Sequence, residues 1–77
     1  MIVLSVLIPA LFAWQDAGEL YRAGLRLFAD HQTDAALAAL RQSVAIQPGN
    51  AAAWKALGVI YASQGDFERA ETPFRNA

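Results

Sequence analysis

The chain repeats its own pattern at a spacing of 34 residues, and this internal period constrains its fold more than any other feature. Residues 17–50 align with residues 51–77 without a gap. In both copies small and apolar side chains recur three and four residues apart, the spacing that places side chains on one face of an α-helix. A period of this length accommodates two helices and their turns. The sequence therefore predicts an all-α solenoid built from antiparallel helix pairs.

Capping residues and chain breakers divide each copy into two helices. We expect helices over residues 17–30, 34–47 and 51–64, and a fourth from residue 67 onward. The candidate N-caps are Asp16 with Glu19 as a capping box, then Thr33, Asn50 and Asp66. Pro48 and Gly49 separate the copies. Pro73 falls inside the last helix and removes a backbone hydrogen bond, so that helix either starts late or bends there.

The second copy carries a specific motif, W-x2-L-G-x2-Y followed by A-x3-F. Its residues are Trp54, Leu57, Gly58, Tyr61, Ala70, Phe74 and Ala77. Here the chain resembles the tetratricopeptide repeat family. The first copy is looser and holds Leu20, Ala23, Gly24, Leu27, Ala36, Leu40, Ser43 and Pro48 at the matching positions. Because glycine has no side chain, we expect Gly24 and Gly58 to let the second helix of each pair approach the first closely.

The resemblance implies a protein-binding function. In tetratricopeptide arrays the first helix of each repeat lines a groove that holds an extended or helical peptide. By matching repeat positions, the groove residues here would be Tyr21, Leu25, Phe28, Lys55, Val59 and Ala62. The first three alternatively pack under the N-terminal segment or against the neighbouring repeat. An apolar groove with one cation favours hydrophobic peptides over the chaperone tails that related clamps grip with basic and asparagine side chains.

The first fifteen residues have a different composition from the rest. They carry no charged side chain, and residues 2–12 form a nearly continuous apolar run that Pro9 interrupts. Since a membrane-spanning helix needs about 20 apolar residues, we interpret this run as an export signal, although no Lys or Arg precedes it and Leu11 occupies a position that favours a small residue. An extra packing segment over the first repeat and a gene-start artefact are the alternatives. Trp14 follows the run and suits an interfacial position. We expect a periplasmic, secreted or membrane-associated protein rather than a cytoplasmic one.

Composition argues against several other functions. The chain has no cysteine, and its 6 basic residues are scattered and balanced by 7 acidic ones, so disulfides, thiolate metal sites and a nucleic-acid surface are not expected. His31 lies between Asp30 and Asp34, in a turn where polar residues are ordinary. No serine has a histidine or lysine at motif spacing. We predict no catalytic residue, no metal site and no cofactor.

We divide the chain into an N-terminal segment (1–16), a first repeat (17–50) and an incomplete second repeat (51–77). Arrays of this kind usually need about three repeats and a polar last helix. We therefore expect the last helix to expose Phe67, Ala70 and Phe74, so the chain either continues in a longer protein or self-associates through this face. Two rival functions remain: a non-catalytic appendage of an enzyme or signalling protein, and a membrane-anchored scaffold.

Overall fold

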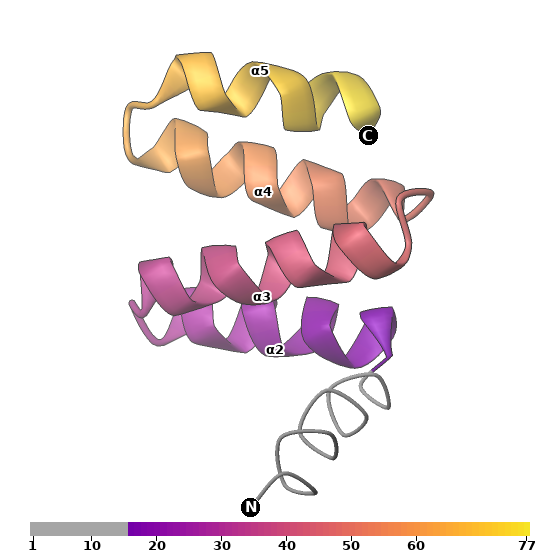
Figure 1. The fold of residues 1–77 in the computed structure, drawn as a ribbon. Coiled ribbons are helices and arrows are strands. Elements are labelled where there is room, and N and C mark those ends of the chain that lie inside the picture. Colours follow the sequence, from indigo (N-terminus) through magenta and orange to yellow (C-terminus); the bar gives the residue numbers. More distant parts are fainter. Residues whose placement is uncertain (1–15) are drawn as a thin grey trace, which may run out of the picture.

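A computed structural model describes residues 16–77, which form four α-helices in two antiparallel pairs (Figure 1). The helices are α2 (Ala17–Ala29), α3 (Thr33–Ile46), α4 (Ala51–Ser63) and α5 (Phe67–Asn76). Each helix packs against the next one in sequence, so the second pair stacks on the first through α3 and α4. The predicted all-α repeat fold is confirmed, and every predicted helix boundary lies within one residue of the observed one.

Three of the four predicted N-caps are confirmed. The carboxylate of Asp16 accepts from the Glu19 N–H at 2.7 Å, that of Asp66 accepts from the Arg69 N–H at 3.2 Å, and the Asn50 side chain caps α4. Thr33 was the wrong choice, because α3 begins at Thr33 itself. The N-cap of α3 is Gln32, because its carbonyl accepts the first helical hydrogen bond, from the Ala36 N–H. The Gln32 side chain makes no capping hydrogen bond.

The turns within the two pairs have the same geometry. At the end of α2 the N–H of His31 donates to Phe28 O, and the N–H of Gln32 donates to Leu27 O. Residues 65 and 66 repeat both hydrogen bonds 34 positions later, at the end of α4. Both turns are therefore Schellman motifs, which need one residue in the left-handed region. That residue is His31 in the first turn (φ 64°) and Gly65 in the second (φ 77°).

One apolar cluster joins the two pairs. Its buried members are Ala36, Leu37, Leu40, Val44, Ala53, Leu57, Ile60, Tyr61 and Ala70. They come from α3, α4 and α5, and α2 packs partly buried side chains against them. Burial of this apolar surface is the main favourable term in the folding of such a small unit.

Each pair crosses at a glycine. A β-carbon added to Gly24 would lie 2.6 Å from Cγ of Leu40, and one added to Gly58 would lie 2.7 Å from the ring of Phe74. Carbon atoms in contact normally stay about 3.5 to 4.0 Å apart. The two helices of each pair are therefore closer at this position than any other residue type would allow without movement.

Polar side chains tie the helices together at their ends. Ser43 is fully buried, and its hydroxyl donates to Ala17 O at 2.7 Å, which holds the start of α2 against α3. The Trp54 indole N–H donates to Pro48 O at 2.7 Å and anchors the connection between the pairs. Among residues 16–77 every buried side-chain nitrogen and oxygen has a hydrogen-bond partner.

The last helix runs through its proline. α5 starts at Phe67 and continues to Asn76, with Pro73 buried inside it. Two of the three residues expected on its open face are exposed, Phe67 at 72% and Phe74 at 45%. The expectation for Ala70 was wrong, since it is 3% exposed. Ala70 lies three residues from Phe67 and four from Phe74, so all three share one helical face. The small Ala70 side chain is covered by the apolar cluster, whereas the larger Phe74 ring lies against Gly58 of α4 and still leaves 45% of the residue exposed.

The predictions made for the first fifteen residues, which concern export, membrane attachment and Trp14, lie outside the described residues. Within residues 16–77 no helix combines the length and the apolar character that crossing a bilayer requires.

Candidate binding groove

A groove of about 400 Å³ lies between the first helices of the two pairs. Its lining residues are Tyr21, Leu25 and Phe28 from α2, and Ala52, Lys55, Ala56, Val59 and Ile60 from α4. The structure thus brings together five of the six residues that repeat matching assigned to a groove. We refer to this surface as the α2–α4 groove.

The groove follows from the direction and composition of its two helices. α2 and α4 run parallel to one another, with α3 and α5 antiparallel to them (Figure 1), and side chains of α2 and α4 line the groove together. Ala52 and Ala56 carry only methyl groups, which leaves space beside the larger side chains of Tyr21 and Phe28. Small residues on one wall and aromatic residues on the other make a depression rather than a closed contact.

Two exposed aliphatic side chains border the α2–α4 groove. Leu25 is 41% exposed and Val59 is 45% exposed, although most large apolar side chains of residues 16–77 are buried or half-buried. They occupy equivalent positions, 34 residues apart. The same position in both repeats therefore presents an unburied aliphatic side chain to the groove, as a binding surface for an apolar partner requires.

Ala62 is the predicted residue that does not line the groove. It is partly buried and packs against the apolar cluster. Tyr21 and Leu25 line the groove together with their repeat equivalents Lys55 and Val59, whereas Phe28 lines it without its equivalent, Ala62.

Repeat matching also missed Ala52, Ala56 and Ile60. They lie four residues apart on α4, and with Lys55 and Val59 they form one helical face. The sequence signal was present as this spacing of small and apolar residues. To predict these groove residues one must know which side of α4 faces α2. The 34-residue period does not give that side.

The repeat-signature residues are mostly interior. Those that are buried are Leu20, Gly24, Ala36, Leu40, Leu57, Gly58, Tyr61 and Ala70. Leu27 and Trp54 are partly buried, while Pro48, Phe74 and Ala77 are exposed. These positions hold the helices together and leave the α2–α4 groove to other side chains.

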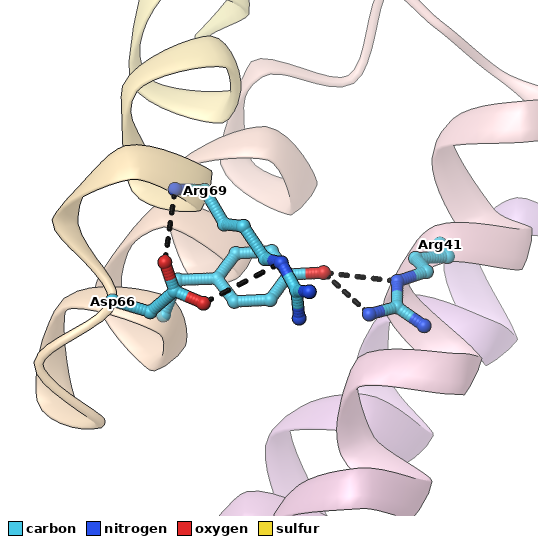
Figure 2. A network of polar contacts seen from close by, with 4 residues as sticks. Arg41, Asp66 and Arg69 are labelled. Carbon is cyan, nitrogen blue, oxygen red and sulfur yellow. Dashed lines mark hydrogen bonds and ion pairs between the residues drawn. The ribbon is translucent and has the colours of Figure 1, made fainter.

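A second depression lies between α3, α4 and α5, and Figure 2 shows polar contacts of three of its lining residues, Arg41, Tyr61 and Arg69. Arg41 donates to the hydroxyl of Tyr61 from Nε at 3.0 Å and also from Nη2. Asp66 accepts from the Arg69 N–H and pairs with its guanidinium at 3.5 Å. These contacts hold Arg41 and Arg69 against neighbouring side chains of this depression.

The polar groups of the described residues include no cluster of metal-ligand type. His31 is exposed at its turn, and within residues 16–77 no three His, Cys, Asp or Glu side chains gather as a metal site would require. The α2–α4 groove contains hydrocarbon, one phenol and one ammonium group, which suit binding by shape, apolar contact and one charge.

Comparison with known proteins gives one finding. A family model described as "Tetratricopeptide repeat" matches residues 27–72, from the last turn of α2 into α5. No curated protein and no solved structure matches the chain.

Proposed function

The chain belongs to the tetratricopeptide repeat family, and from this membership we propose that it binds a protein partner by receiving a segment of it in the α2–α4 groove. Repeats of this family generally mediate protein–protein interaction and are typically non-catalytic. The observation that supports the proposal best is the exposure of Leu25 and Val59, at equivalent positions, toward one depression. Because Leu25 is 41% and Val59 45% exposed, burial of the remaining surface by a partner would contribute roughly 1 kcal/mol each.

A peptide-display selection tests this proposal. Random peptides are selected on the immobilised full chain, and the affinity of the enriched peptides is then measured for three variants. Leu25→Gln and Val59→Gln each replace a groove aliphatic with a polar side chain that favours helix. We expect each to weaken binding about tenfold, which corresponds to about 1.4 kcal/mol.

Ile46→Gln is the matched control, because Ile46 is an aliphatic residue that is 54% exposed on α3 and does not line the groove. It should leave the affinity unchanged. Circular dichroism checks that all three variants keep their helix content. If no peptide is enriched, or if all three variants bind alike, the groove is not the binding surface and the proposal is wrong.

Self-association through α5 is a second proposal, supported by the exposure of Phe67 and Phe74. These residues are seven positions apart, so they lie on one helical face. A second copy of the chain could bury both rings. Light scattering on the full chain decides this: a dimer that Phe67→Gln converts to a monomer supports the proposal, and a monomer of 8.3 kDa contradicts it.

A further inference from the structure

Lys55 is the only charged side chain that lines the α2–α4 groove. Among residues 16–77 it forms no ion pair, and the first fifteen residues carry no carboxylate side chain. Its neighbours at three and four positions along α4 are Ala51, Ala52, Gly58 and Val59, none of which is acidic. The chain therefore supplies no local counter-charge to this ammonium group.

The arginines of the chain differ from Lys55 in having acidic or hydrogen-bonding partners nearby. Arg69 pairs with Asp66, Arg75 pairs with Glu71 at 3.4 Å, and Arg41 donates to a phenol oxygen. Arg22 and Arg26 form no ion pair among residues 16–77, but each has an acidic residue within reach along the chain, Glu19 three residues before Arg22 and Asp30 four residues after Arg26. Lys55 thus combines an apolar surrounding with the absence of a partner.

We infer that the partner segment bound in the α2–α4 groove is apolar and carries one carboxylate that pairs with Lys55; this inference rests on the proposed function. A segment that covers the groove takes water away from the ammonium group. Loss of that hydration is unfavourable unless the partner replaces it with an acceptor, and a carboxylate is the acceptor that also neutralises the charge.

The position of Lys55 also sets where the carboxylate lies. Lys55 is the repeat equivalent of Tyr21, and Val59 is the equivalent of Leu25, so these four residues form two levels along the groove. The levels are four helical residues apart, or about 6 Å. In a helical partner the acidic residue would therefore be four positions from the side chain that contacts Leu25 and Val59, and in an extended partner two positions.

A double-mutant cycle on the full chain tests the inference. Each peptide selected on the chain is compared with a version in which its Glu or Asp is changed to Gln or Asn, and both are measured on the wild-type chain and on Lys55→Gln. On the wild-type chain we expect removal of the carboxylate to weaken binding about threefold to tenfold, with a smaller loss at high salt. On Lys55→Gln the same change should have almost no effect.

Arg22→Gln is the control, because this arginine follows Tyr21 in sequence but does not line the groove. On Arg22→Gln, removal of the peptide's carboxylate should weaken binding as much as it does on the wild-type chain. Equal losses on the wild-type chain and on Lys55→Gln would overturn the inference. The proposed function would still hold in that case, provided that Leu25→Gln and Val59→Gln weaken binding. Enriched peptides without acidic residues would overturn the inference as well.

Discussion

His31 has a backbone conformation that histidine seldom adopts. Its φ of 64° lies in the left-handed region, where the β-carbon of an L-residue comes close to the following carbonyl oxygen. The equivalent residue of the second repeat is Gly65, which takes a similar φ of 77° without that contact. Both residues occupy the left-handed position of a Schellman motif, so both repeats require this turn geometry. Only the first repeat places a residue with a β-carbon, His31, at that position.

Replacing His31 with glycine should therefore stabilise the protein. We expect His31→Gly to raise the free energy of unfolding by about 1 kcal/mol, because relief of the left-handed strain exceeds the extra entropy that glycine loses on folding. For a chain of this size that corresponds to an increase in Tm of roughly 4–8 °C. Thermal unfolding followed by circular dichroism measures it.

Gly65→Ala provides the reverse comparison. It should lower stability by about 1 kcal/mol, since alanine would adopt the same strained φ. If His31→Gly destabilises the chain while Gly65→Ala does not, the two turns do not share the geometry described here.

At the scale of helices, the two pairs share a close crossing but fill it differently. Gly24 on α2 faces Leu40, which is fully buried, and the contact is made by Cγ, near the backbone of α3. Gly58 on α4 faces the ring of Phe74, which is 45% exposed. The Cγ atom of Leu40 is buried and cannot move aside, whereas the partly exposed ring of Phe74 can rotate toward solvent. The first pair is therefore less tolerant of an added methyl group than the second.

We expect alanine at the two crossings to have unequal effects. Gly24→Ala should lower the free energy of unfolding by about 1–2 kcal/mol, because overpacking in the core outweighs the roughly 1 kcal/mol by which alanine favours helix. Gly58→Ala should change stability by less than about 0.5 kcal/mol, since displacement of the Phe74 ring roughly offsets the same helix preference. Urea unfolding of both variants measures the difference; equal losses would show that Phe74 is held as firmly as Leu40.

At the scale of the whole molecule, the two repeats share one apolar cluster. Its members come from α3, α4 and α5, and α2 packs on its edge. Ile60 lies in this cluster and is 1% exposed. Because α3 and α4 are the facing helices of the two pairs, neither pair buries its apolar surface alone. The repeats should accordingly unfold as one unit.

Ile60→Val tests this coupling. Removal of one buried methyl group should cost about 0.5–1.5 kcal/mol. Under native conditions we expect faster amide hydrogen exchange in α2 as well as in α4 and α5, because local destabilisation spreads through a shared core. Faster exchange confined to α4 and α5 would show that the first pair is stable by itself.

Most of the fold could be predicted because its causes are local or periodic. Carboxylate and amide caps stop helices by bonding to N–H groups three residues away, so Asp16, Asn50 and Asp66 marked helix starts that the structure confirms. Glycine at the same place in both copies indicated two close crossings. The cap of α3 was missed because the Schellman turn ahead of it begins the helix one residue early, and that turn depends on the backbone of His31 rather than on a side chain.

The sequence by itself determined the helices, their pairing and the apolar positions between them, since a 34-residue period and residue spacing fix which side chains share a helical face. Only the tertiary structure decided which of the remaining faces meet. It placed Ala52, Ala56 and Ile60 along the groove beside α2 and left Ala62 outside it, because the angle at which one pair stacks on the next depends on packing between side chains distant in sequence. The groove, and the place of Lys55 within it, follow from that stacking.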